Sequence, residues 1–243
     1  MDRHEQEPGT LDELPDFQPE KPGFPLWQHV KSTSRSFTMM EAGQVLLQAG
    51  GEIDKDPAAG LYLDLVLERE LVGRAGLLGH GRLGARVEST LWLDAGVYEF
   101  STVWRSDRPL GTVHQFWMAR PDIDQDPQHQ YKLSLACNGG PLFTRLSFGH
   151  PAQVRAAAVY EAELLEPDSK MELWMYARAL PSNSVQSLGY DRRANGRRIE
   201  KIQLAKTLSL PPASPYNGVW QIETVMESRN ARPSGSGLAL HIR

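Results

Sequence analysis

Aromatic and basic side chains at strand spacing are the residues of this chain best suited to contact another molecule. In the segment 171–178, Trp174 and Tyr176 fall on the same side of an expected strand as Glu172 and Arg178. An exposed aromatic ring can stack on the apolar face of a sugar ring or on a partner subunit, whereas a buried ring fills a core. Because its side of the strand is polar, Trp174 is expected to be exposed.

Further aromatic candidates come from other expected strands and from the N-terminal segment. Trp92 and Trp117 share their sides of their strands with polar residues, so both are expected at a surface, and Trp27 is expected to anchor the N-terminal segment. Trp220 shares its side with Ile222, which favours core packing. The aromatic contact candidates are Trp27, Trp92, Trp117, Trp174 and Tyr176.

Four arginines gather around an expected turn at 191–198: Arg192, Arg193, Arg197 and Arg198. The two arms of a tight hairpin would bring their guanidinium groups together, which suits a phosphate, a sulfated glycan or an acidic segment of a partner. The alternative is a solvated turn that contributes only solubility. In a specific form of the first interpretation, the acidic segment 12–20 of one subunit docks on this basic tip of another.

Three aspartates at alternate positions, Asp122, Asp124 and Asp126, have the spacing that presents carboxylates to a hard cation such as calcium. An EF-hand loop also requires glycine at its sixth position and glutamate at its twelfth, where this chain has Pro127 and Leu133. An acidic loop flanked by prolines is usually a solvated turn. We therefore predict no metal site, and calcium at this loop stays open as an alternative.

Motifs of known enzyme classes are missing from the sequence. There is no Gly-x-Ser-x-Gly elbow, no P-loop, no His-Glu-x-x-His and no dinucleotide fingerprint. Cys137 has no evident base partner and is interpreted as a small buried thiol. We predict a protein that is not an enzyme, with no catalytic residue and no cofactor. A carboxylate pair brought together from distant strands, as in glycosidases, is neither supported nor ruled out.

The elements that must position these residues are about a dozen short strands separated by turn residues. The period of two is clearest at 96–105, where Tyr98, Phe100, Thr102 and Trp104 share one side. Such a face packs against a second layer. The predicted fold class is all-β: an antiparallel β-sandwich or jelly roll with an extended, proline-rich N-terminal arm. No internal repeat is evident in the sequence.

Turn signals suggest how the strands connect. Asp94–Gly96, Asn138-Gly139 and Asn195-Gly196 each predict a tight hairpin, and Asn-Gly in particular tolerates the positive φ of a type I′ turn. The segment 154–166 is ambiguous, because its alanines and glutamates favour a short helix while its valines and tyrosine favour a strand.

Two regions differ in composition. Residues 1–30 are rich in proline and acidic residues, which predicts an extended arm, and residues 31–243 are predicted to form the β-sandwich domain. From composition alone, the arm is either a free tail or a segment held by its own body or by a neighbouring subunit.

The overall composition of the chain limits the kinds of partner and location that we expect for it. A formal charge of -4 gives no reason to expect nucleic acid, no apolar run is long enough to span a membrane, and the N-terminus lacks the apolar core of a signal peptide. A single cysteine excludes an internal disulfide framework and fits a protein made in a cytosol.

The segment Leu93–Arg105 resembles the L-x-A-G-x-Y-x-F-x-x-x-x-R hairpin of β-sandwiches of the carbohydrate-binding-module type, which also occur in phage tail and capsid accessory proteins. The resemblance covers about a dozen residues and implies the fold more than the ligand. No sugar-contacting residue is transferred from it.

Two functions follow as expectations. The first is a structural assembly protein, such as a phage capsid, decoration or tail component, made in the host cytoplasm, located in the virion and contacting copies of itself or other structural proteins through its N-terminal arm. The alternative is a glycan-binding or adhesion module, for which a surface glycan would be the partner.

Overall fold

The computed structural model describes residues 29–55, 61–77, 81–106, 113–121, 131–137, 139–194, 196, 198–213 and 218–243. These residues form strands and no helix, which confirms the all-β prediction, and they contain no helix that could cross a membrane. The predicted arm lies outside the described residues except for His29 and Val30, which begin the first strand. The strands are β1 (His29–Met39), β2 (Gly43–Lys55), β3 (Leu61–Leu67), β4 (Glu70–Leu77), β5 (Gly81–Leu93), β6 (Gly96–Ser106), β7 (Val113–Arg120), β8 (Tyr131–Cys137), β9 (Gly139–Leu146), β10 (Ala152–Leu164), β11 (Lys170–Leu180), β12 (Ser184–Ala194), β13 (Arg198–Leu210), β14 (Val219–Arg229) and β15 (Ala231–Ile242).

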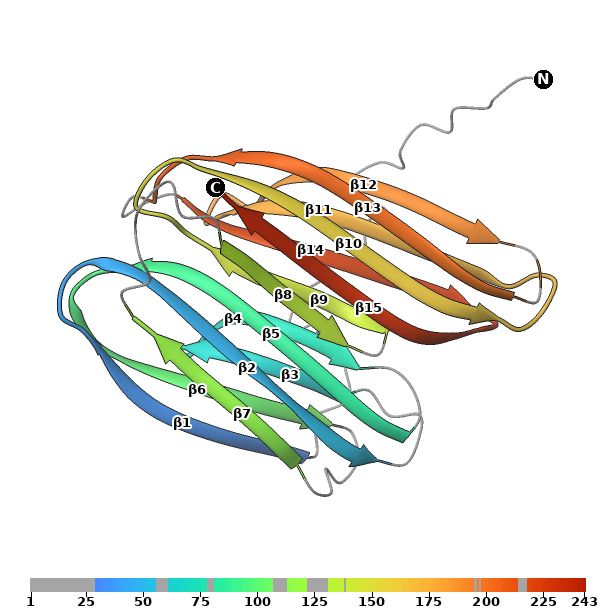
Figure 1. Ribbon diagram of the computed structural model, residues 1–243, viewed down its shortest axis with the longest axis horizontal. Helices are drawn as coiled ribbons and strands as arrows, with labels where there is room; N and C mark the ends of the chain where they lie inside the picture. The colour runs from blue at the N-terminus through green and yellow to red at the C-terminus, as the bar shows by residue number, and fades with distance from the viewer. Residues whose placement is uncertain are drawn as a thin grey trace.

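The strands form two layers (Figure 1). Layer A has the strand order β1-β6-β3-β4-β9-β14-β11-β12, and layer B has the order β7-β2-β5-β8-β15-β10-β13. Neighbours within each layer are antiparallel, and one parallel pair among the described residues, Thr90 with Leu146, joins β5 of layer B to β9 of layer A. The arrangement is an antiparallel β-sandwich, as predicted.

Most connections cross from one layer to the other. The prediction that three of these turns form hairpins is wrong. The strands on either side of each turn, β5 and β6, β8 and β9, and β12 and β13, lie in different layers and do not pair. Hairpins of paired neighbours occur in the described chain at β3–β4, where Glu68 and Arg69 both have positive φ, and at β11–β12. A tight glycine turn bends the chain equally well between layers, so turn residues alone do not indicate which strands pair.

The pairing pattern occurs twice along the chain. In the first half, β1-β6-β3-β4 faces β7-β2-β5, and in the second half β9-β14-β11-β12 faces β15-β10-β13. Each strand of the first half corresponds to the strand eight positions later, although no repeat is evident in the sequence. β8 is additional and lies between β5 and β15, where it joins the halves.

A β-bulge recurs at the same place in both halves. In the β3–β4 pair, Leu65 lies opposite Gly73 and the register then shifts. In the β11–β12 pair, Met175 lies opposite Gly189 and the register shifts in the same way. The residue preceding each glycine is buried, Val72 in β4 and Leu188 in β12. The shared bulge makes Leu65 and Met175 equivalent positions.

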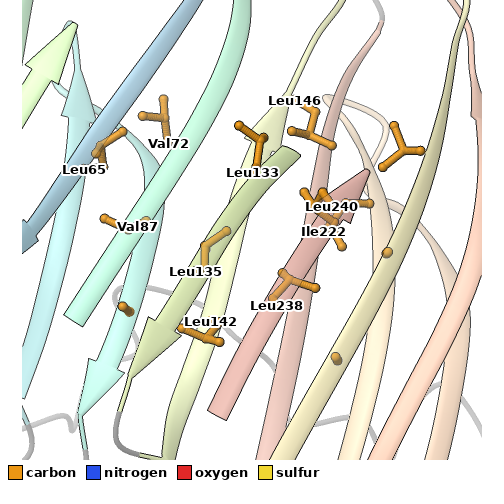
Figure 2. Close-up of a cluster of buried hydrophobic side chains, with 14 of the residues drawn as sticks. Leu65, Val72, Val87, Leu133, Leu135, Leu142, Leu146, Ile222, Leu238 and Leu240 are labelled. Carbon is orange, nitrogen blue, oxygen red and sulfur yellow. The ribbon is translucent and has the colours of Figure 1, made fainter. Parts of the chain in front are cut away.

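The core lies between the layers and continues from one half to the other (Figure 2). Phe100 and Trp104 are buried in it, which confirms the predicted inward side of 96–105, and Trp220 packs partly buried against it. Every second residue of β10 from Ala152 to Leu164 is buried, so the ambiguous segment is a strand. Labelled core residues in the figure are Leu65, Val72, Val87, Leu133, Leu135, Leu142, Leu146, Ile222, Leu238 and Leu240.

Candidate functional site

The outer face of layer A, which is turned away from layer B, carries a group of aromatic and charged side chains suited to contact a ligand. Alternation along each strand decides which residues belong to it. In β11, Leu173 and Met175 are buried in the core, so Trp174 and Tyr176 lie on the opposite, outer side. The pairing of β11 with its neighbours then gathers residues from four strands, β9, β14, β11 and β12, on one surface.

An aromatic pair lies at the β12 side of this face. Trp174 and Tyr190 are direct cross-strand partners, and their ring centroids are 5.2 Å apart with an interplanar angle of 31°. Tyr190 is 49% exposed and Trp174 is partly buried. Burial, followed by the nearby Glu172 carboxylate, raises the pKa of the Tyr190 phenol. Two adjacent, partly exposed rings, tilted against each other and held by paired strands, form an apolar patch.

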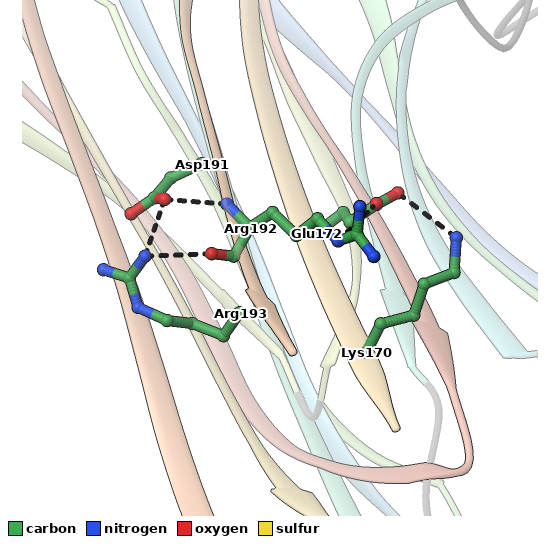
Figure 3. A network of polar contacts seen from close by, with 5 residues as sticks. All are labelled: Lys170, Glu172, Asp191, Arg192 and Arg193. Carbon is green, nitrogen blue, oxygen red and sulfur yellow. Dashed lines mark hydrogen bonds and ion pairs between the residues drawn. The ribbon is translucent and has the colours of Figure 1, made fainter. Parts of the chain in front are cut away.

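An ionic network borders the aromatic pair (Figure 3). The buried carboxylate of Glu172 lies 3.7 Å from Lys170 Nζ and 3.5 Å from Arg192 Nε, its cross-strand partner. One residue further, Asp191 Oδ1 accepts hydrogen bonds from the Arg192 backbone N–H at 2.7 Å and from Arg193 Nη1 at 2.6 Å. The arginines predicted as a basic tip therefore face carboxylates, which lowers the positive charge they present.

A buried polar cluster lies on the other side of the aromatic pair. Glu223 on β14 accepts hydrogen bonds from Arg178 Nη2 at 3.1 Å and from Gln221 Nε2 at 2.8 Å, and its carboxylate is almost fully buried. Gln221 lies between Arg145 of β9 and Arg178 of β11 in the strand register, and Glu223 lies opposite Tyr176. These hydrogen bonds fix the orientation of the Glu223 carboxylate, the Arg178 guanidinium and the Gln221 amide without a bound ligand.

Three donors of this cluster are buried without a hydrogen-bond partner among the described residues: Arg145 Nε, Arg178 Nε and the Tyr176 hydroxyl. Burial, with the carboxylates of Glu223 and Glu227, raises the pKa of the Tyr176 phenol well above its usual range, so this hydroxyl keeps its proton. A buried polar group without a partner costs about 1–3 kcal/mol of stability. Three on one surface are unusual in a folded core and point to a binding surface.

The equivalent place in the first half is filled by charged residues of the chain itself. Asp64 is fully buried and accepts from Arg74 at 2.6 and 2.8 Å and from Arg105 Nε at 2.8 Å. The Arg74 guanidinium also lies 4.9 Å from the centre of the Tyr62 ring. Both oxygens of this carboxylate therefore already have partners within the chain.

The shared bulge shows that these two places correspond. Asp64 precedes Leu65 and Arg74 follows Gly73, just as Trp174 precedes Met175 and Tyr190 follows Gly189. A cross-strand ion pair in the first half thus occupies the position of a cross-strand aromatic pair in the second. The candidate site is therefore a property of the second half.

The remaining predicted contact residues lie elsewhere. Trp92 is partly buried on layer B, its backbone N–H donates to Ser147 Oγ at 2.8 Å, and a Cβ on Gly149 would overlap its ring, so it packs against the segment between β9 and β10. Trp117 pairs with Ala49 in the strand register, and its side chain lies outside the described part.

Trp27 and Arg197 also lie outside the described residues, and Arg198 is exposed and forms an ion pair with Glu200. The sequence predicted Trp174 and Tyr176 on one side of a strand and Arg192 and Arg193 at a separate turn. The pairing of β11 with β12 places Arg192 on the side of Trp174 and Tyr176, whereas Arg193 pairs with the buried Met171 and lies on the opposite side. Sequence reasoning missed Arg145, Gln221 and Glu223, which reach the same surface from other strands. A polar residue inside an apolar strand was the available signal for each.

Metal binding finds no support in the described part of the chain. No three His, Cys, Asp or Glu side chains there gather as ligands for a metal ion. The candidate calcium residues Asp122, Asp124 and Asp126 lie outside the described residues, so that alternative stays a prediction.

Comparison with known proteins gives little beyond this geometry. No family model matches the chain, and no curated protein matches it. Among solved structures it is similar to the N-terminal CBM22-1-CBM22-2 tandem domain of Xyn10C from Paenibacillus barcinonensis, with 7% identity over 88% of this chain and 91% of that chain. The TM-score is 0.29, a likeness too low to carry an argument. The fold and the site thus define a two-layer antiparallel β-sandwich with a duplicated strand order.

Proposed function

We propose that this chain is a non-catalytic carbohydrate-binding module whose site is the outer face of layer A in the second half. The observation that carries the proposal is the cross-strand pair Trp174 and Tyr190, with rings 5.2 Å apart beside a hydrogen-bonded polar cluster. A sugar ring has an apolar C–H face, which stacks on aromatic rings, and a rim of hydroxyls, which bonds to polar groups. The surface offers both.

The polar side of the site supports the same function. Glu172 and Glu223 are buried carboxylates already held by neighbouring cations and by Gln221. Planar groups fixed in this way lose little conformational freedom when they bind hydroxyls, which favours affinity for a flexible saccharide. We assign no catalytic role to either carboxylate, because nothing in their geometry distinguishes a general acid from a nucleophile.

The test is titration of the purified chain against a panel of soluble oligosaccharides. We expect Trp174→Ala and Tyr190→Ala each to weaken binding of the best ligand at least tenfold, because stacking area is lost. Tyr98→Ala is the matched control: Tyr98 also stacks on an aromatic partner, Phe37, at 5.7 Å, but near the turn before β6 in the first half. Binding by the control should stay unchanged. Absence of any saccharide ligand, or equal loss in all three variants, would contradict the proposal.

The expectation of a structural assembly role stays a prediction. It depends mainly on the arm of residues 1–30, almost all of which lies outside the described residues, and no contact among the described residues favours it. The predicted virion location and self-association stay predictions for the same reason. Light scattering of the full chain would test self-association directly.

A further inference from the structure

Among the described residues, the buried donors without a partner on the outer face of layer A lie close together. Two belong to arginines in one cross-strand row, and the third belongs to Tyr176 next to that row. Arg145, Gln221 and Arg178 are consecutive cross-strand neighbours on β9, β14 and β11. Two strand spacings of about 4.8 Å place the Arg145 and Arg178 backbones about 10 Å apart. Tyr176 is two residues from Arg178 on the same side of β11. Its hydroxyl and both arginine Nε groups are buried, with no hydrogen-bond partner in the part of the chain that the structure describes.

These groups call for an acceptor rather than a donor. An arginine has only donors, and the Tyr176 phenol keeps its proton because burial and the Glu223 carboxylate raise its pKa. The carboxylate of the cluster, Glu223, already receives bonds from Arg178 and Gln221. A ligand oxygen that enters this cluster therefore meets donors at Arg145, Arg178 and Tyr176.

Charge favours the same kind of ligand. Arg178 pairs with the buried carboxylate of Glu223, and a second guanidinium group, of Arg145, lies opposite the neighbouring Gln221. Arg145 also pairs with Glu70 at 2.9 Å, but the Glu70 side chain is 75% exposed, so water and salt screen its charge. Glu227, on the same side of β14, is exposed as well. Two guanidinium groups, 22% and 23% exposed, therefore stand beside one carboxylate that is almost fully buried.

We propose that the saccharide bound by this site is acidic, with the carboxylate of a uronic acid residue accepting from Arg178, Arg145 and Tyr176. A neighbouring sugar of the same chain stacks on Trp174, four residues from Arg178 on the same side of β11 and about 13 Å away by strand rise. The inference rests on the proposed function and names the ligand class for the same site. Charge-assisted bonds to arginine are about twice as strong as neutral ones, so the carboxylate sets the preference.

The experiment compares matched ligands that differ only in charge. Oligosaccharides of galacturonic acid and of glucuronic acid are titrated beside their fully methyl-esterified forms and beside neutral oligosaccharides, at low and at high salt. We expect at least one acidic form to bind at least tenfold more tightly than its ester, and the difference to shrink at high salt.

Variants locate the preference in the cluster. Tyr176→Phe removes one hydroxyl and Arg178→Gln removes one charge, and each should lower the preference for acid over ester several-fold while Trp174→Ala weakens both ligands equally. Arg232→Gln is the control, since Arg232 is an exposed arginine paired with Glu163 on layer B. Thermal melting of each variant shows that it is folded, and Tyr176→Phe keeps the test sharp if Arg178→Gln is unstable.

The outcomes separate this inference from the proposed function. Binding of neutral sugars or esters as tightly as of acids, lost in Trp174→Ala, would overturn the acidic ligand and leave the carbohydrate site standing. An acid preference unchanged in Tyr176→Phe and Arg178→Gln would also overturn the assignment to this cluster. If no saccharide binds at all, both proposals fall.

Discussion

Asp64 and Trp174 occupy equivalent positions in the two halves, yet their surroundings differ. Asp64 is a buried carboxylate enclosed by Arg74 and Arg105, whereas Trp174 is partly buried beside an exposed tyrosine. In the first arrangement both carboxylate oxygens already accept hydrogen bonds from arginines, whereas the second leaves an aromatic surface. Divergence at one position of a repeated hairpin is enough to separate a structural role from a binding role.

The structural role of Asp64 gives the first prediction. Asp64→Asn keeps the shape of the side chain but removes the charge that compensates Arg74, whose side chain is only 9% exposed. Breaking a buried ion pair by removing one partner costs several kcal/mol, and we expect a fall of about 3 kcal/mol in the free energy of unfolding. Urea denaturation followed by tryptophan fluorescence measures it.

A surface ion pair provides the control for this variant. Glu163→Gln removes a carboxylate that lies 3.4 Å from Arg232 and is 47% exposed. Exposed pairs contribute about 0–1 kcal/mol, so this change should be barely measurable. Equal effects of the two substitutions would show that burial does not decide the strength of these pairs.

At the scale of elements, the bulged hairpins depend on glycine. A Cβ on Gly73 would lie 2.7 Å from Val87 Cγ2 on the facing layer, closer than atoms pack, so β4 approaches β5 where no side chain intervenes. Gly73→Ala should therefore destabilise the protein by about 1–3 kcal/mol through overpacking. Urea midpoints of the variant and of the native chain test this.

Two further variants make the cause of that loss testable. Gly235 lies in β15 with no atom within 4 Å of an added Cβ, so Gly235→Ala should leave stability unchanged or raise it slightly. Combining Gly73→Ala with Val87→Ala should cost less than the sum of the two single changes, since the smaller side chain makes room. Strict additivity would argue against the proposed clash.

The positions of the strands could be predicted from the sequence far better than the pairing between them. The period of two placed Phe100 and Trp104 in the core, which the structure confirms; it also predicted an exposed Trp174, which lies on the outer side of layer A but is partly buried. The glycine turns were misread as hairpins because local turn chemistry is the same whether a chain folds back within a layer or crosses to the other. Pairing depends on contacts far apart in sequence, which periodicity does not contain.

The candidate site was predictable to the same partial extent. Alternation grouped Trp174 with Tyr176 on one side of a predicted strand, but Arg192 was assigned to a separate turn and joins them only because β11 pairs with β12. Arg145 and Glu223 join them only because β14 pairs with both β9 and β11. The duplicated strand order was not predicted for a related reason. Two halves can have the same strand pairing while they share only the alternation of buried and exposed residues and not the residue types.

At the scale of the whole molecule, the two halves share strands and core. β9 pairs with β4 of the first half and with β14 of the second, and β8 pairs with β5 and β15. The hydrophobic core in Figure 2 includes buried side chains from both halves, and the buried hydroxyls of Ser89 and Thr144 form hydrogen bonds between β5 and β9. Halves joined in this way lose buried apolar surface if either unfolds alone, so we expect one cooperative unfolding transition.

Equivalent core substitutions in the two halves test that expectation. Leu65→Ala and Met175→Ala each remove a fully buried side chain from the position opposite the bulge glycine, at a cost of about 2–5 kcal/mol. If the halves unfold together, calorimetry will show a single peak for each variant, shifted downward as a whole. If either substitution splits the peak and leaves one part at the native temperature, the halves are independent domains. The ligand site would then belong to a unit that folds without the first half.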